Sequence, residues 1–417
     1  MKDLVLFLSQ ILLGWLFVQI TIISKFLYSL GSGQSISDEE LPKAAIILSL
    51  RGADPFLSHT LRSLLQQNYP IYNLKIVVDS LQDPAWDVAT SIINEYNAQN
   101  VQISPLRNPL STCSLKCSSI VQAVSELDSS YQVVALVDAD AVVHPNWLRD
   151  LVSPLSNPKI GATTGNRWYL PTGDYWGSMV RYLWNVSAVI QMVMYQIAWG
   201  GSLAIKTEAI RKTGLIDVWK HSYTDDTILR SLFQKHGLRV QFVPSIIILN
   251  REECKLFNLL PWLRRQLLTS RLYHPCWILV VADSVFTILL PTTILALSLI
   301  LFLIGEQQTA GFTFAVFFSY TVVLVIFTLI IDSCIRRIIR DRNEIIPSLS
   351  LATVAKIFIA TPFTQWTSGL VMLSSLWVKS IEWRGVRYRI KSPWNIELVE
   401  YIPYRFVNKS NQNKISL

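Results

Sequence analysis

The sequence predicts an α/β protein in which a mostly parallel sheet carries helices on both faces, with transmembrane helices at both ends of the chain. The first observation is that short apolar segments of strand length alternate with helical segments between residues 44 and 251. The second is that long apolar segments flank this region. With 51% hydrophobic and only 16% charged residues, the chain is too apolar for an ordinary soluble enzyme, so part of it is expected to lie in lipid.

The N-terminal segment is expected to be a membrane anchor. Residues 4–30 are apolar for longer than the ~20 residues that cross a bilayer core. A secretory signal peptide is the alternative interpretation, but its apolar region would be shorter and a small-residue cleavage site would follow it. We therefore expect a retained anchor over residues 1–30, followed by a polar linker over residues 31–43.

A soluble domain is expected over residues 44–255. Strands are predicted at 44–50, 73–80, 101–104 and 131–140, and helices at 56–67, 85–96 and 114–127. This alternation indicates a parallel sheet covered by helices on both faces. In such sheets ligands bind outside the carboxyl ends of the strands, so polar residues at these ends are the first candidates for a functional site.

The C-terminal third returns to the membrane. Residues 256–275 are predicted to form an interfacial amphipathic helix, and 276–380 to contain membrane helices, with clear spans at 277–304 and 312–332. A third apolar zone, 345–378, contains a lysine, a proline and a glutamine, and either one tilted span or a re-entrant hairpin fits it. The sequence ends in a predicted basic tail, 381–417, which favours the hairpin because both flanks would then lie on one side.

Charge and cysteine usage indicate the compartment. Much of the formal net charge of +8 comes from basic clusters at 336–342 and 384–391, beside the apolar segments. This placement predicts a multi-pass protein with a cytoplasmic soluble domain, and it favours contact with an anionic membrane surface over contact with nucleic acid. The five cysteines show no disulfide spacing, so free thiols in a reducing compartment are expected. A bacterial plasma membrane is the expected location.

Carboxylates follow two of the predicted strands. Asp79 ends the second strand, and Asp138 and Asp140 follow the strand that starts near residue 131. A buried carboxylate pair is unfavourable unless a cation or hydrogen-bond donors offset its charge. Two carboxylates separated by one residue can hold a hard divalent cation, Mg²⁺ or Mn²⁺, that shares its other positions with substrate phosphates.

A further acidic segment occurs at residues 224–237. Thr224 is expected to be the N-cap of a helix whose first turn contains Asp225 and Asp226. In one interpretation the two carboxylates only complement the helix dipole. In the other they belong to the same site as the strand-end aspartates.

Four segments carry a resemblance to a known family: SLRGADP (49–55), QQNYP (66–70), VVDSLQDPAWD (77–87) and EWRGVRYRI (382–390). Together with the three acidic motifs, their order resembles that of inverting family-2 glycosyltransferases with the glycosyltransferase-A fold, and more closely the ceramide glucosyltransferase-like branch. The resemblance covers most of the chain. It implies a sheet that binds a nucleotide sugar, and transfer of a hexose, UDP-glucose being the expected donor, to a membrane lipid such as ceramide or diacylglycerol.

The resemblance also implies roles for individual residues. Asp79 would contact the uracil or ribose, and Asp138 and Asp140 would hold the diphosphate through the divalent cation. Asp226 would be the general base, with Asp225 in the position of a second acidic residue. Inversion in one step needs such a base on the acceptor hydroxyl and no covalent nucleophile.

One motif departs from the family. A Q-x-x-R-W or R-x-x-R-W sequence is expected on the interfacial helix, but here Gln266 is followed at the expected offset by Thr269 and Ser270. Either Arg265 or Arg271 could supply the missing cation for the diphosphate. Alternatively, the arginines of this helix form only the polar face of a membrane-surface helix.

The acceptor pocket has four further candidates. Gly200 and Gly201 precede a predicted strand, where glycines would let the backbone approach the sugar or would simply form a tight turn. Trp199 is suited to stacking on a sugar or to lying at the membrane interface. His221, three residues before Thr224, is a candidate for contact with the acceptor.

The expected function is therefore a membrane-bound, metal-dependent, inverting glycosyltransferase that uses a nucleotide sugar and a lipid acceptor. A processive polysaccharide synthase is one alternative, although it would require more spans and the complete Arg-Trp motif. A catalytically inactive membrane scaffold of the same fold is the other. The sequence does not predict the oligomeric state.

Overall fold

The computed structural model describes residues 2–31, 36–171 and 175–404 of the chain. Residues 32–35 of the predicted linker and residues 405–417 of the predicted basic tail lie outside the described residues.

The helices are α1 (Lys2–Ser29), α2 (Leu57–Leu65), α3 (Pro84–Glu95), α4 (Leu115–Ser125), α5 (Trp147–Val152), α6 (Trp176–Tyr195), α7 (Thr207–Thr213), α8 (Leu215–Trp219), α9 (Leu229–Gln234), α10 (Leu256–Tyr273), α11 (Trp277–Ser284), α12 (Leu290–Leu303), α13 (Gln307–Asp341) and α14 (Leu351–Ser375). The strands are β1 (Ala44–Leu50), β2 (Tyr72–Val78), β3 (Val101–Pro105), β4 (Val133–Val137), β5 (Ile160–Thr164), β6 (Arg167–Tyr169), β7 (Ser202–Lys206), β8 (Arg239–Phe242), β9 (Ile248–Asn250), β10 (Ser380–Trp383), β11 (Val386–Ser392) and β12 (Asn395–Glu400).

The central sheet has seven strands in the order β3-β2-β1-β4-β7-β5-β8. Strands β1 to β4 pair in parallel, and so do β5 and β8, whereas β7 runs antiparallel to both of its neighbours. The prediction of a mostly parallel sheet is thus confirmed, with β7 as the exception. Because β1 lies between β2 and β4, the strand order reverses beside it, and ligands bind at such a point in sheets of this kind.

Helices cover both faces of the sheet, as predicted. Alternate residues of β1 explain why. Ile46 and Leu48 belong to a core built with α2, α3 and α5, whereas Ile47 belongs to a second core built with α4 and α7 to α9. A strand buried on both faces needs a continuous apolar run, which is what the sequence of β1 provides. Burial of each of these aliphatic side chains stabilises the fold by about 1.5–3 kcal/mol.

The acidic segment after residue 223 is not the start of a helix, so that prediction is wrong. Thr224, Asp225 and Asp226 lie in a loop, and α9 begins only at Leu229. The hydroxyl of Thr224 donates to Asp226 Oδ1 and caps no helix. The interpretation in which these carboxylates complement a helix dipole is therefore wrong as well.

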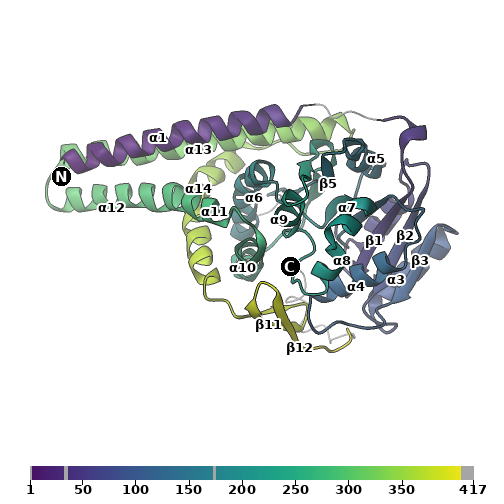
Figure 1. Cartoon of the computed structure of the whole chain (residues 1–417). Coiled ribbons are helices and arrows are strands. Elements are labelled where there is room, and N and C mark those ends of the chain that lie inside the picture. Colours follow the sequence, from purple (N-terminus) through teal and green to yellow (C-terminus); the bar gives the residue numbers. More distant parts are fainter. Residues whose placement is uncertain (1, 32–35, 172–174, 405–417) are drawn as a thin grey trace.

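Among the described residues, three helical segments are long and apolar enough to cross a membrane: α1, the segment from Trp277 to Leu303, and α13. The second segment comprises α11 and α12, joined by a π-helical turn, Val285–Leu289. In Figure 1 α1, α12 and α13 extend side by side away from the α/β domain, in agreement with their mutual contacts.

The third apolar zone forms one continuous helix, α14, that passes through Pro362. The hairpin favoured from the sequence is therefore wrong. Helix α14 packs against α6, α10 and α13, which places it between the α/β domain and the extended helices (Figure 1).

The segment after α14 is a folded element instead of a tail. Strands β10, β11 and β12 form a three-stranded antiparallel sheet. Val386 and Tyr388 of β11 are fully buried in the second core, and the Tyr388 hydroxyl accepts a hydrogen bond of 3.2 Å from the backbone N–H of Leu115. The C-terminal sheet therefore docks against the N-terminus of α4, close to the carboxyl end of the central sheet.

Candidate active site

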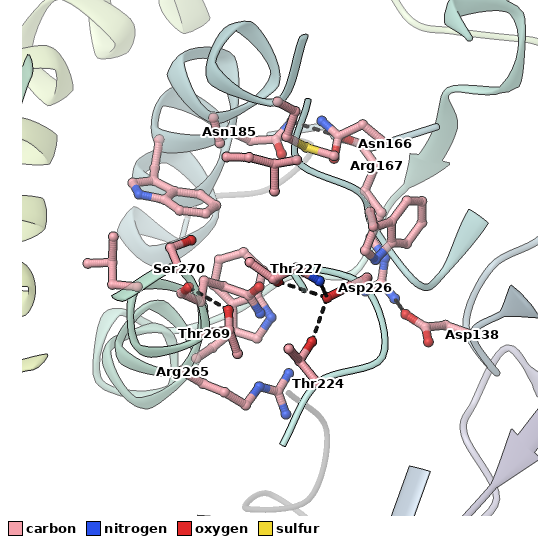
Figure 2. A pocket seen from close by; sticks show the side chains of 18 of the residues that line it. Asp138, Asn166, Arg167, Asn185, Thr224, Asp226, Thr227, Arg265, Thr269 and Ser270 are labelled. Carbon is pink, nitrogen blue, oxygen red and sulfur yellow. Dashed lines mark hydrogen bonds and ion pairs between the residues drawn. The ribbon is translucent and has the colours of Figure 1, made fainter. Parts of the chain in front are cut away.

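A cavity of about 390 Å³ lies where β1, β2 and β4 end, and it continues between α6, α10, α11 and α14. Figure 2 shows its wall, with Asp226, Asp138 and Arg167 on one side and Arg265, Thr269 and Ser270 of α10 on another. All three predicted acidic motifs line it. Residues from Ser49 to Arg384, far apart in the sequence, thus line one cavity.

The carboxylates that follow β4 are neutralised by two cations. Asp138 accepts from Lys116 Nζ at 2.9 Å through Oδ1 and from Arg167 Nη2 at 2.7 Å through Oδ2. Asp140 accepts from the same Arg167 nitrogen at 2.6 Å. Burial acts to raise the pKa of Asp138, but Lys116 and Arg167 outweigh it and hold that pKa well below its usual range. Burial raises the pKa of Asp140, against the opposing effect of Arg167.

The Asp138–Asp140 pair fits a divalent cation by its donor set. Both carboxylates direct an oxygen at one point, which the Arg167 nitrogen holds. Carboxylate oxygens are the ligands that Mg²⁺ and Mn²⁺ prefer. No cluster of three or more acidic, histidine or cysteine side chains suited to a metal occurs among residues 2–31, 36–171 and 175–404, so substrate oxygens would have to complete the shell.

Asp226 is held in place by four hydrogen bonds. Its Oδ1 accepts from the Thr224 hydroxyl at 2.5 Å and from the backbone N–H and hydroxyl of Thr227 at 2.5 and 2.9 Å. Its Oδ2 accepts from the backbone N–H of Gly200 at 2.7 Å. Two of these contacts are drawn in Figure 2, where the carboxylate lies on the cavity wall. These donors fix the orientation of the Asp226 carboxylate.

Asp225 lies deeper, with 4% of its surface exposed. Burial raises its pKa to about 6, although Lys116 opposes the rise. The Nζ of Lys116 lies 3.1 Å from Asp225 Oδ2 and also binds Asp138, so this lysine joins the 138–140 motif to the 224–226 motif. Burial acts to lower the pKa of Lys116, but the surrounding aspartates raise it above its usual value, and the lysine stays charged.

The segment from Trp199 to Gly201 is built around these carboxylates. A Cβ at Gly200 would lie 1.9 Å from Asp225 Oδ2, and one at Gly201 would lie 2.4 Å from Asp138 Oδ2. The Trp199 ring lines the cavity and lies 4.9 Å from the Arg167 guanidinium. The predicted glycines are therefore required for close approach of the backbone to the acidic residues. Whether they also contact the acceptor stays a prediction.

Asp79 forms the other end of the site. Its Oδ2 accepts from Arg51 Nη1 at 2.5 Å and from the backbone N–H of Tyr404 at 2.8 Å. Arg51 also donates to the backbone carbonyl oxygens of Arg384 and Ile402, at 3.1 and 2.9 Å. The C-terminal segment thus completes this end of the cavity.

Helix α10 presents only one of the two candidate arginines to the cavity. Arg265 lines the cavity, and its guanidinium lies 5.2 Å from the Trp383 ring. Gln266, Thr269 and Ser270 line the cavity as well. Arg271 lies outside the lining and donates to the backbone carbonyl oxygens of Leu376 and Val378. The structure therefore places Arg265 at the cavity, whereas Arg271 connects α10 to the segment after α14.

His221 is also misplaced by the sequence prediction. Its ring is exposed, lies outside the cavity lining, and interacts through Nδ1 with the backbone carbonyl oxygen of Asp217 at 3.1 Å. Asp226, five residues further along, lines the cavity, so the two side chains have different surroundings.

Sequence reasoning missed most of the cations at the site. Lys116 and Arg167 bind the aspartates directly, and Arg384 lies 3.4 Å from Asp54 at the cavity wall. Arg51 and Arg384 occur inside two of the segments that carry the family resemblance, which is a signal that could have identified them. No comparable signal marks Lys116 or Arg167, whose positions depend on how α4 and β6 pack.

The fold and the site together define a class. A mostly parallel sheet with an aspartate pair at its carboxyl edge, beside a second acidic loop in the same cavity, resembles the glycosyltransferase-A fold. The chain matches the model of Glycosyl transferase family 21 over residues 7–396, so it belongs to that family and is a glycosyltransferase.

Comparison with individual proteins gives the following similarities. A 66-residue segment is 35% identical to a ceramide glucosyltransferase of Pyricularia oryzae, and it covers 15% of this chain and 13% of that protein. The structure resembles that of the mannosyltransferase PcManGT from Pyrobaculum calidifontis in complex with GDP-Man and Mn²⁺, with a TM-score of 0.51, 13% identity, and coverage of 89% of this chain and 99% of that one. A glucosyl-3-phosphoglycerate synthase from Mycobacterium tuberculosis matches 57% of this chain and 84% of that one with a TM-score of 0.39 and 14% identity.

Proposed function

We propose that this glycosyltransferase moves a hexose from a nucleotide sugar to the hydroxyl group of a membrane lipid, with inversion at the anomeric carbon. The observation that carries the proposal is the course of one cavity. It begins at Asp79 and the Asp138–Asp140 pair, passes Asp226, and ends between helices of the membrane-associated part of the chain. A polar donor and an amphiphilic acceptor can therefore enter the same site from opposite ends.

The donor would lie at the sheet end of the cavity. Asp79, held by Arg51, would bind the nucleoside, and the diphosphate would lie between the Asp138–Asp140 pair and Arg265. UDP-glucose is the first donor to test, and GDP-mannose, which PcManGT binds in its solved complex, is the second. A bound Mg²⁺ or Mn²⁺ would offset the negative charge that develops on the departing diphosphate.

Asp226 would act as the general base. The acceptor oxygen attacks the anomeric carbon while its proton passes to the Asp226 carboxylate, and the bond between that carbon and the diphosphate oxygen breaks. The products are the glycolipid and the nucleoside diphosphate. Hydrogen bonds from Thr224, Thr227 and Gly200 would keep the carboxylate oriented before the reaction. Asp225 would support this site through Lys116.

The acceptor would reach the site from the bilayer. Helix α10 would lie at the membrane surface, α1, α11–α12 and α13 would cross the bilayer, and the α/β domain would face the cytoplasm, with the basic segment near residue 340 on the same side. A bacterial plasma membrane is the proposed location. Ceramide, diacylglycerol and related amphiphiles fit this geometry because their hydroxyl lies at the headgroup plane.

The test is release of nucleoside diphosphate by the purified protein in detergent, with Mn²⁺ or Mg²⁺, UDP-sugars or GDP-mannose, and defined lipids. The variants are Asp226→Asn and the control Asp217→Asn, which makes the same change on an exposed carboxylate of α8. We expect lipid-dependent release by the wild type and the control, a loss of at least 100-fold in Asp226→Asn, and one sugar per lipid in the product. Lipid-independent release of equal rate, or activity in Asp226→Asn, would refute the proposed reaction. A polymeric product would indicate a processive synthase.

A further inference from the structure

The C-terminal sheet extends one hairpin turn to the wall of the active-site cavity. Trp383 pairs with Val386, so the turn between β10 and β11 consists of Arg384 and Gly385 alone. Both residues have positive φ angles, 48° and 73°, as a favoured type of two-residue hairpin turn requires. Asparagine, aspartate or glycine is usual at the first of these positions, and an arginine there is uncommon. Because residues in such conformations cluster at functional sites, Arg384 is a candidate for a functional role.

Arg384 lies between the Asp79 end of the cavity and the aspartate pair that follows β4. Its Nη1 donates to the backbone carbonyl oxygen of Arg51, the residue that binds Asp79, and Arg51 Nε donates to the backbone carbonyl oxygen of Arg384 at 3.1 Å. Burial raises the pKa of Asp140, and Arg384 opposes this rise. Among the described residues, the carboxylate paired with Arg384 is that of Asp54, at 3.4 Å. A guanidinium carries five N–H donors, so Arg384 retains donors for a further anion.

A second guanidinium faces the same cavity without a counter-charge. Arg265 of α10 lines the cavity, and it forms no ion pair with a carboxylate in the part of the chain that the structure describes. Burial lowers the pKa of Arg265, and Arg384 acts in the same direction, so the two cations lie close enough to repel each other. A cation withdrawn from water is unfavourable until an anion balances it. An anion bound by both arginines would remove their repulsion.

Trp383 contacts both guanidinium groups. Its ring lies 5.2 Å from the guanidinium of Arg265 and 5.5 Å from that of Arg384. The face of a tryptophan ring attracts cations, so this side chain holds the two arginines near one another. On α10 itself, threonine and serine occupy positions 269 and 270, where an arginine and a tryptophan were expected from the sequence. The hairpin thus brings an arginine and a tryptophan to this helix from a distant part of the chain.

We propose that Arg384 and Arg265 together bind the diphosphate of the nucleotide sugar, and that Trp383 is a positioning residue that holds their guanidinium groups. A diphosphate fits this place because its oxygens accept paired hydrogen bonds from guanidinium groups, while its nucleoside would lie toward Asp79. The hairpin turn thereby takes the place of the Arg-Trp motif that α10 lacks. This inference rests on the proposed function and extends the donor site to residues 383 and 384.

A purely structural role for Arg384 makes a different prediction. If its side chain only connects the hairpin to the segment after β1, its loss would weaken the binding of a nucleoside and of its diphosphate by the same factor. The ratio of the dissociation constants for uridine and UDP separates the two roles, because these ligands differ only in the diphosphate.

The experiment measures Kd for UDP and uridine by competition with labelled UDP-glucose in the presence of Mn²⁺, and for GDP and guanosine by competition with labelled GDP-mannose. The variants are Arg384→Asn, which suits the positive φ of the turn, and Arg384→Lys, which keeps the charge. The control is Arg387→Asn, the same change at an exposed arginine of the same hairpin that lies outside the cavity lining.

In Arg384→Asn, binding of the nucleoside diphosphate should weaken by at least about tenfold, as expected for the loss of a hydrogen bond to a charged group. Binding of the nucleoside should stay as in the wild type, so the ratio of the two constants should fall. Arg384→Lys should give an intermediate ratio, because lysine lacks the planar fork of arginine. The control should keep the wild-type ratio.

The role of Trp383 has its own readout. Trp383→Leu should weaken binding of the diphosphate by about two- to fivefold, in line with the loss of cation–π contacts. Trp383→Phe should restore most of this loss, because phenylalanine keeps a ring face for the arginines. An equal loss of nucleoside affinity in Trp383→Leu would show that this ring only supports the cavity wall, and the positioning role would then be wrong.

An unchanged ratio in both Arg384 variants would overturn the inference, as would an equal fall in the control. Failure of the proposed function gives other patterns. A wild type that binds the diphosphate through Arg384 but glycosylates no lipid leaves this inference intact and refutes the lipid acceptor. A wild type that binds neither nucleotide refutes both. Because Arg384→Lys keeps the charge and a similar length, it supplies the ratio if Arg384→Asn does not fold.

Discussion

Replacement of Lys116 by methionine tests the electrostatic design of the site. This side chain is the cation that the structure places on the buried carboxylate of Asp225, at 3.1 Å, whereas Asp138 keeps Arg167 when the lysine is lost. Methionine has a similar length and no charge. The variant therefore leaves the buried Asp225 carboxylate without its cation, and it also removes the Lys116 contacts with Asp138 and with the Gly200 carbonyl oxygen.

The expected loss follows from burial. Removing one partner of a buried ion pair costs about 3–5 kcal/mol, and we take the lower end because the Lys116 side chain is 22% exposed. At pH 8 the free energy of unfolding should therefore fall by about 3 kcal/mol. For a domain of this size, that loss corresponds to a decrease of about 9 °C in Tm. Without Lys116 the pKa of Asp225 rises above its value of about 6. Since this folded-state pKa exceeds the unfolded one, protonation favours the folded state, and at pH 5 the loss should shrink to about 1 kcal/mol.

The assay is thermal unfolding of the wild type, Lys116→Met and Lys220→Met in one detergent at pH 5 and pH 8. Lys220 pairs with Asp217 on the surface, so its replacement should leave Tm unchanged at both values. An equal Tm difference between Lys116→Met and wild type at the two pH values would show that Asp225 is not the group left unpaired, and the reasoning would then be wrong.

Four further outcomes are expected. Gly200→Ala should abolish transfer and lower the free energy of unfolding by about 1–3 kcal/mol, because its Cβ would lie 1.9 Å from Asp225 Oδ2. The control Gly311→Ala, which has open space at the Cβ, should change neither the activity nor the stability. Equal transfer rates in Gly200→Ala and wild type would contradict this prediction. The rate of transfer should fall as the pH drops below about 6, because Asp225 becomes protonated there and no longer balances the charge of Lys116. A transfer rate that stays constant from pH 5 to pH 8 would exclude this dependence. A chelator should remove activity, and added Mn²⁺ should restore it. In the presence of UDP, Asp140→Asn should weaken the increase in Tm that Mn²⁺ causes in the wild type. An unaltered increase in Tm would mean that Asp140 holds no metal. His221→Ala should keep the wild-type rate, since the ring is exposed and outside the cavity, and a large loss in steady-state kinetics would show that the site extends to it.

The strand-end aspartates were predictable because a strand buried on both faces leaves a readable signal. Five successive buried residues form β4, and the chain becomes polar at Asp138, where the strand ends. The loop at Thr224 was misread because Thr and Asp favour both helix N-caps and turns. Here the Asp226 side chain accepts from Thr227 and from Gly200, a residue 26 positions away, and local sequence does not reveal the second contact.

The C-terminal sheet could have been predicted in part. In β11, buried Val386, Tyr388 and Ile390 alternate with exposed Arg387 and Arg389, which is the period-two pattern of a strand with one buried face. The basic residues of this segment led instead to the prediction of a basic tail.

The cations at the aspartates had no such local pattern. Lys116 lies on α4, which packs against β1 and β2, and it reaches Asp138 after β4. Arg167 lies on β6, shortly after β5, and it reaches both Asp138 and Asp140. These approaches are set by tertiary packing, which propensity and periodicity do not encode.

The contact between Asp79 and the C-terminal segment bears on how the protein is made. Tyr404 and Ile402, whose backbones bind Asp79 and Arg51, are synthesised only after α1, α11–α12 and α13. The last folding step at this end of the site therefore comes after those helices have been synthesised. A chain stalled before residue 380 lacks the contacts of Ile402 and Tyr404 with Arg51 and Asp79.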